Sequence, residues 1–139
     1  MTHHASSEDL EFQRTFEACE TAPAAFDHAA HVRLAYIYLC TDSVEVAATK
    51  MQRSLRAFLA HWGAGESKYH ETMTRAWIMA VDHFMARSQH CPSAAAFMAA
   101  NPALLDGKIM LTHYSAEVLF SPEARQFFVR PDMQPIPPP

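Results

Sequence analysis

The chain has few glycines and no alternating runs, and both absences point to an all-helical fold. Only three glycines occur among its 139 residues, at Gly63, Gly65 and Gly107, and each lies between periodic segments. No continuous run alternates strictly between apolar and polar residues, which is the pattern of a half-buried strand. Half of the residues are hydrophobic, a proportion that excludes a disordered chain.

Other absences narrow the class of protein. No run of Lys or Arg appears, and 15 acidic residues outnumber 11 basic ones, so we expect no nucleic-acid partner. No stretch reaches the roughly 18 apolar residues of a membrane helix, and the N-terminus does not resemble a signal peptide. Cys19, Cys40 and Cys91 form no CxxC pair, which favours free thiols in a reducing compartment. We therefore expect a cytoplasmic protein without a membrane partner. The sequence indicates no oligomeric state.

Capping residues and prolines divide the chain into helices within one domain, residues 1–139. Ser6 or Ser7, Asp27, Ser43 and Ser93 are good N-cap residues. The predicted helices cover about 7–19, 28–40, 44–62, 69–88, 93–101, 108–120 and 121–129. The fold predicted is all-α, with a four-helix up-down bundle followed by short C-terminal helices. Residues 1–5 and the proline-rich residues 130–139 are predicted to be extended tails, with His3 and His4 solvated.

Three histidines are predicted to meet at one end of this bundle. If the first four helices alternate up and down, the second and fourth run parallel and begin at the same end. His28 and His31 occupy the first turn of the second helix, and His70 occupies the first turn of the fourth. All three lie on faces that apolar residues continue. Two helix N-termini at this end would favour neutral imidazoles and would attract an anion.

Neutral imidazoles that converge in an apolar pocket usually bind a metal or transfer a proton. We therefore predict a small metal-dependent enzyme in which His28, His31 and His70 bind a divalent transition metal. Zn, Fe, Ni and Cu all suit three nitrogen ligands, so ligand type does not choose among them. Glu71 is the predicted base, which favours hydrolysis or proton transfer over oxygen chemistry. The partner is a small molecule, and an anionic one would suit the helix N-termini.

Other interpretations of these residues stay open. One is a non-catalytic module that binds a metal or a small anion. Another is a metal-free enzyme in which a histidine and Glu71 act as acid and base. A third is that the histidines only pack and form hydrogen bonds in the core.

Several further residues are candidate accessories to the site, namely His61, Arg33, Thr74, Tyr38, Tyr69 and His113. Thr74 shares the face of His70, and its hydroxyl either orients that ring or bonds back to its own helix. Arg33 is interpreted as an ion-pair residue, with an anchor for a substrate anion as the alternative. His113 lies in a segment that the sequence does not place.

Four motifs run through the chain. They are Phe26-x-His28-x-x-His31-x-Arg33-x-Ala35, Tyr69-His70-Glu71-Thr72-x-Thr74-x-x-Trp77, Tyr114-Ser115 and Phe120-Ser121-Pro122-Glu123-Ala124-Arg125. Together they resemble a group of small, uncharacterised bacterial all-helical proteins, over about residues 26–137. The resemblance implies a site at the His-x-x-His and Tyr-His-x-Thr elements and implies no substrate. A looser similarity is to DinB-like helical bundles, which place three histidines around a metal with a different spacing.

Overall fold

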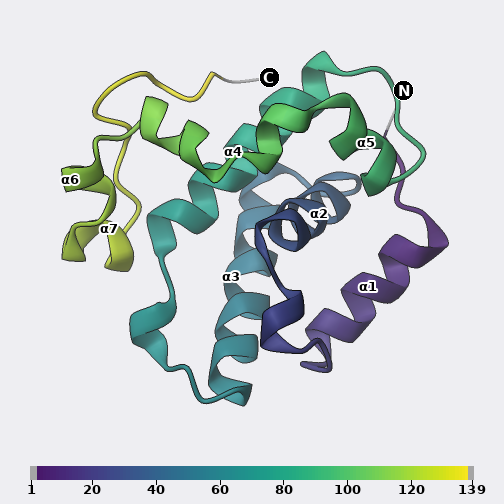
Figure 1. Cartoon of the computed structure of the whole chain (residues 1–139), viewed down its shortest axis with the longest axis horizontal. Helices are drawn as coiled ribbons and strands as arrows, with labels where there is room; N and C mark the ends of the chain where they lie inside the picture. The colour runs from purple at the N-terminus through teal and green to yellow at the C-terminus, as the bar shows by residue number, and fades with distance from the viewer. Residues whose placement is uncertain (1–2, 138–139) are drawn as a thin grey trace.

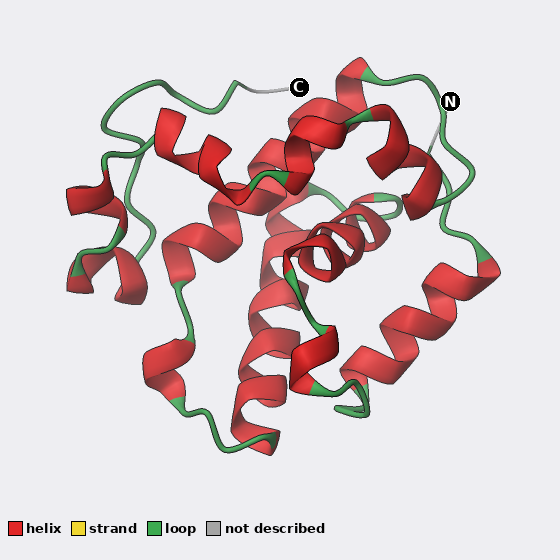
Figure 2. Ribbon diagram, in the orientation of Figure 1, coloured by secondary structure: helices red, strands yellow, loops and turns green. Residues whose placement is uncertain are grey.

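The computed structural model describes residues 3–137, and every regular element in that range is a helix (Figures 1 and 2). The α-helices are α1 (Ser7–Glu17), α2 (His28–Leu39), α3 (Val44–His61), α4 (Glu71–Arg87), α5 (Ala94–Ala100), α6 (Ala116–Leu119) and α7 (Pro122–Gln126). Short 3₁₀ helices lie between them: η1 (Pro23–Ala25), η2 (Glu66–Lys68), η3 (Pro102–Leu105) and η4 (Gly107–Thr112). The predicted all-helical class is confirmed. None of these helices combines the length and apolar character needed to cross a bilayer.

Capping side chains begin the helices where the sequence predicts. Ser6, Asp27 and Ser43 each accept a hydrogen bond from a backbone N–H in the first turn of α1, α2 or α3. Such an N–H has no carbonyl partner within its own helix, so the cap stabilises the helix end. Ser93 and Ser121 do the same for α5 and α7.

Helix α1 ends at Glu17 rather than at about residue 19, and three other predicted boundaries are wrong. Helix α4 begins at Glu71 instead of about residue 69, because His70 is its N-cap residue. The segment 108–120 is divided into η4 and α6, because Ser115 caps a new helix there. Helix α7 ends at Gln126 rather than near residue 129, and Phe127 is already extended.

Helix α2 is buried on nearly every side. Eight of its twelve residues are buried, and it contacts α1, α3, α4, α5 and η3. The continuous apolar run over residues 34–39 leaves no polar face to expose, which is typical of a central helix. Figure 1 shows α2 nearly end-on, whereas α3 runs from top to bottom in the plane of the page, so α2 crosses α3.

Helices α1 to α4 form the core, but the predicted up-down bundle is not confirmed. Helices α1 and α4 both contact α2 and α3. The beginning of α2 meets α4 partway along its length, where the rings of His28 and Trp77 lie 4.5 Å apart. Trp77 follows the start of α4 by nearly two turns, which is roughly 10 Å along the helix axis. The first turns of α2 and α4 are therefore offset.

A buried carboxylate joins three helices. Asp9, which is 2% exposed, accepts hydrogen bonds from the backbone N–H groups of Ser6 at 3.0 Å and Ala94 at 2.8 Å. Its other oxygen accepts from Nε of Arg33 at 3.0 Å. Burial alone raises the pKa of Asp9, but these hydrogen bonds outweigh burial and hold the pKa below its ordinary value. Asp9 therefore links the ends of α1 and α5 to the middle of α2.

Both predicted tails pack against the helices. Nε2 of His3 donates to the carbonyl of Met85 at 2.7 Å, and Nδ1 accepts from the N–H of Cys91 at 3.3 Å. The prediction that His3 is solvated is wrong, because the residues before α1 cross the junction between α4 and α5. In the other tail, Ile136 is 7% exposed and belongs to the core. Residues 1–2 and 138–139 of these tails lie outside the described residues.

The substitution Asp9→Ala tests the three-helix junction. It leaves the buried N–H of Ala94 and the partly buried N–H of Ser6 without an acceptor, and Arg33 without its ionic partner, so we expect the free energy of unfolding to fall by about 3 kcal/mol. Urea denaturation followed by circular dichroism measures the change. Glu8→Ala removes the neighbouring exposed carboxylate and should have little effect. Similar losses in the two variants would contradict the role of Asp9.

Candidate functional site

His70, a predicted metal ligand, uses both ring nitrogens within the chain. As the N-cap residue of α4, it accepts a hydrogen bond on Nδ1 from the N–H of Met73 at 3.0 Å. Its Nε2 donates to the carbonyl of Leu119 at 2.7 Å. These partners require the neutral ring with its proton on Nε2, and burial, which lowers the pKa of His70, favours that form. No nitrogen lone pair is left for a metal, so His70 joins α4 to α6.

His28 and His31 lie together in the first turn of α2. Nε2 of His28 donates to the carbonyl of Leu104 at 2.9 Å, and the ring lies edge-on to Trp77. The ring of His31 lies 6.0 Å from that of Phe26, and its buried Nε2 has no hydrogen-bond partner among the described residues. Burial, with a smaller contribution from the charge of His28, lowers the pKa of His31 to about 4. His31 is therefore neutral near pH 7.

The three histidines do not form the predicted ligand set. Because α2 crosses the bundle, His28 contacts α4 at Trp77, whereas His70 caps the start of α4 and contacts α6. Within residues 3–137, no three His, Cys, Asp or Glu side chains are grouped so that they could hold one metal ion. The prediction assumed that the first turns of two parallel helices lie side by side, and the crossing of α2 removes that condition. A Zn, Fe, Ni or Cu enzyme stays a prediction that this arrangement does not support.

Two candidate accessories form polar contacts between helices. The hydroxyl of Tyr38 donates to Glu17 Oε2 at 2.7 Å and shares a hydrogen bond with Ser54 at 2.8 Å. Arg33 pairs with the buried carboxylate of Asp9 at 3.0 Å. The interpretation of Arg33 as an ion-pair residue is confirmed. Both side chains hold α2 against its neighbours.

Three other candidate accessories lie apart from one another. The hydroxyl of Thr74 donates to the carbonyl of His70 at 2.8 Å, which is the back-bonding alternative. His61 is exposed at the end of α3. Nδ1 of His113 donates to the carbonyl of Gln134 at 2.8 Å, which places His113 against the C-terminal tail. None of these side chains completes a site with His28 or His31.

Tyr69 and Glu71 are predicted site residues that the structure brings together. The hydroxyl of Tyr69 donates to Glu71 Oε1 at 2.6 Å, and Gln52 Nε2 donates to the same oxygen at 3.4 Å. Burial, followed by the bond to Glu71, raises the pKa of Tyr69. The guanidinium of Arg56 lies 4.6 Å from the centre of the Tyr69 ring. Tyr69 thus stays protonated, and one carboxylate oxygen of Glu71, Oε1, is already hydrogen-bonded.

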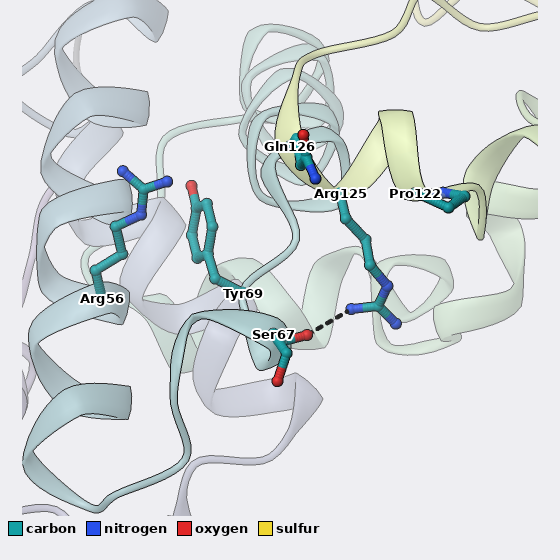
Figure 3. A pocket seen from close by; sticks show the side chains of 6 residues that line it. All are labelled: Arg56, Ser67, Tyr69, Pro122, Arg125 and Gln126. Carbon is teal, nitrogen blue, oxygen red and sulfur yellow. Dashed lines mark hydrogen bonds between the residues drawn. The ribbon is translucent and has the colours of Figure 1, made fainter.

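A cavity of about 430 Å³ lies beside Tyr69, between α3, η2 and α7 (Figure 3). We name it the arginine pocket, and its lining residues are Arg56, Ser67, Tyr69, Pro122, Arg125 and Gln126. Figure 3 shows Arg56 and Arg125 on opposite sides of Tyr69. Arg125 donates to the carbonyl of Ser67 at 3.2 Å, which uses one of the five N–H groups of its guanidinium. The cavity therefore brings together two cationic groups from distant parts of the chain.

The start of α4 holds α7 in position for this pocket. The hydroxyl of Thr72 donates to the carbonyl of Phe127 at 2.8 Å and accepts from the N–H of Val129 at 3.0 Å. The bond from His70 to Leu119 fixes the adjoining α6. In Figure 1, α6 and α7 lie beside the beginning of α4, in agreement with their contacts. His70 and Thr72 thus help to place Arg125 without lining the pocket.

The arginine pocket could not be found from the sequence. Arg56 lies on the polar side of α3, where an arginine is usually solvated. Arg125 belongs to the last of the four motifs, yet nothing in that motif points to α3. No fixed spacing relates residues so far apart in the chain.

Comparisons with protein-family models, curated proteins and solved structures find no match to this chain. The resemblance to small bacterial helical proteins is therefore untested and stays a prediction.

Replacing His70 tests whether it is a structural residue. His70→Ala removes the acceptor for Met73 and the donor for Leu119, so we expect the free energy of unfolding to fall by about 2–3 kcal/mol in urea denaturation. His70→Asn keeps an acceptor at the N-cap and should recover part of that loss. Elemental analysis of protein purified without a nickel column tests the alternative that His70 binds a metal. Stoichiometric metal in the parent and none in His70→Ala would show that His70 is a ligand.

The lowered pKa of His31 makes stability depend on pH. An unfolded histidine has a pKa of about 6.5, whereas folded His31 has a pKa of about 4, so between these values the unfolded state binds the extra proton. The free energy of unfolding should therefore fall as the pH drops from about 6.5 to about 4, by up to ~3 kcal/mol from this residue. Urea titrations of the parent and His31→Leu across this range measure the effect. Equal pH slopes in the two proteins would refute it.

Proposed function

We propose that this protein is a binding module for a small anionic ligand, which occupies the arginine pocket. The observation that carries the proposal is that Arg56 of α3 and Arg125 of α7 line one cavity. A guanidinium presents a planar fork of N–H donors that matches a carboxylate or a phosphate. The volume of about 430 Å³ falls within the range of small-molecule sites, roughly 300–1,000 Å³.

The other lining residues suit recognition better than catalysis. The Tyr69 hydroxyl already donates to Glu71, so it does not donate to the anionic group, and its oxygen can only accept from a donor elsewhere on the ligand. The amide of Gln126 offers both a donor and an acceptor, and Pro122 provides an apolar wall. None of the six described lining residues is a His, Cys, Asp or Glu, so the lining offers no carboxylate or imidazole base that could activate the hydroxyl of Ser67 as a nucleophile. We therefore favour binding without turnover.

The enzyme predicted from the sequence has weaker support. His28, His31 and His70 do not line the arginine pocket, and both nitrogens of His70 have partners within the chain. Glu71 shares one of its oxygens with Tyr69 and does not line the pocket either. In a metal-free enzyme, a histidine and Glu71 would act on one substrate, but they do not line a common cavity that could hold it.

Removing either arginine should weaken the binding of anions. We expect Arg125→Gln and Arg56→Gln each to lower the affinity for citrate or inorganic phosphate by about tenfold or more. The reason is that a hydrogen bond to a charged group contributes roughly 1.5–3 kcal/mol. Isothermal titration calorimetry at low salt measures the dissociation constants, and added KCl should raise them.

Arg53→Gln is the matched control, because Arg53 is an exposed arginine of α3 that does not line the pocket. Its affinity for either anion should stay within about twofold of the parent. A loss equal to that of Arg125→Gln would indicate a general effect of charge. If the parent binds neither anion at millimolar concentration, the proposal is wrong.

A further inference from the structure

A second cavity, of about 410 Å³, lies at the other end of α4. Its walls come from the N-terminal residues, the end of α2, the last turns of α4 and His90. They include Asp82, the apolar side chains of Leu39 and Met85, and the ring of His3. Because Arg56 and Arg125 lie near the start of α4, this cavity is separate from the arginine pocket.

Asp82 carries the one acidic side chain among the described lining residues, and no Lys or Arg lines the cavity with it. The carboxylate is partly buried and makes no hydrogen bond or ion pair with any residue in 3–137. Burial raises the pKa of Asp82, and the neighbouring His83 opposes that rise only in part. A carboxylate that is partly removed from water without a partner is less favourable than a solvated one, so Asp82 is suited to a cation from outside the chain.

Asp82 is the source of negative charge in this cavity, as the bonding of the other titratable side chains on its walls indicates. Both nitrogens of His3 are bonded, to Met85 and Cys91, in the pattern of a neutral ring. The ring of His90 stacks on His3, with centroids 5.7 Å apart and planes at 20°. Burial raises the pKa of Cys40 to about 11, which keeps this thiol uncharged at neutral pH.

We propose that this cavity, the Asp82 pocket, binds a small organic cation with a primary ammonium group. The ammonium would donate to the Asp82 carboxylate, and the rings of His3 and His90, which stack on each other, form part of the wall beside it. Leu39 and Met85 provide contact for a short carbon chain. An organic cation fits better than a metal ion, because no three His, Cys, Asp or Glu side chains within residues 3–137 are grouped for a metal.

Titration with n-butylammonium chloride, followed by ¹H–¹⁵N NMR, tests the proposal. We expect saturable shifts of amide signals around Asp82, Met85 and His90, and much smaller shifts with n-butanol, which has the same chain without the charge. Asp82→Asn should weaken binding at least tenfold. Glu117→Gln removes an exposed carboxylate of α6 and should leave the affinity unchanged.

Thermal melting at pH 7 gives a second readout that does not depend on the amide assignments. Asp82→Asn should melt at or above the temperature of the parent, because it removes an unpaired charge. Butylammonium should raise the melting temperature of the parent but not that of the variant.

Three results would overturn the proposal. The first is equal shifts with n-butanol, which would mean that the cavity binds carbon chains alone. The second is equal affinity in Asp82→Asn. The third is a lower melting temperature for Asp82→Asn than for the parent, which would mean that the carboxylate stabilises the fold.

Discussion

The need to bury α2 on nearly every side governs the arrangement of this protein. A helix of 12 residues with eight buried has no wide polar face, so other elements must cover it from several directions. Helices α1, α3, α4 and α5 do so, together with η3. Asp9 and Arg33 add a partly buried ionic contact to this packing and fix α1 and α5 relative to α2. The crossing of α2 over α3 then decides where the first turn of α2 lies.

Helix α4 connects this core to both candidate binding sites. At its start, His70 and Thr72 hold α6 and α7 through hydrogen bonds, so that Arg125 lies across a cavity from Arg56. At its end, Asp82 lines a cavity that the N-terminal residues help to close. The 17 residues of α4 span roughly 25 Å. One helix thus separates a cavity with two cationic side chains from a cavity with one anionic side chain.

Helix starts could be predicted from the sequence, whereas contacts between distant side chains could not. The beginnings of α2 and α3 were predictable, because Asp27 and Ser43 act on backbone groups only a few residues away. The adjacency of His28 and His31 was also predictable, because residues three apart in a helix lie on the same face. The convergence of His70 with that pair was not, since it required a parallel alignment of α2 and α4 that capping residues do not control. The histidine of the Tyr-His-x-Thr element, His70, instead caps α4 and bonds to α6.

The sequence by itself determined that the chain is helical, where most helices begin, and which faces are apolar. These properties depend on local hydrogen bonds and on the period of the helix, so a short window contains all the information. Only the tertiary structure decided which side chains meet. The angle at which helices cross depends on how side chains from distant segments pack together. That angle separates His70 from His28, and the attachment of α6 and α7 to α4 brings Arg125 opposite Arg56.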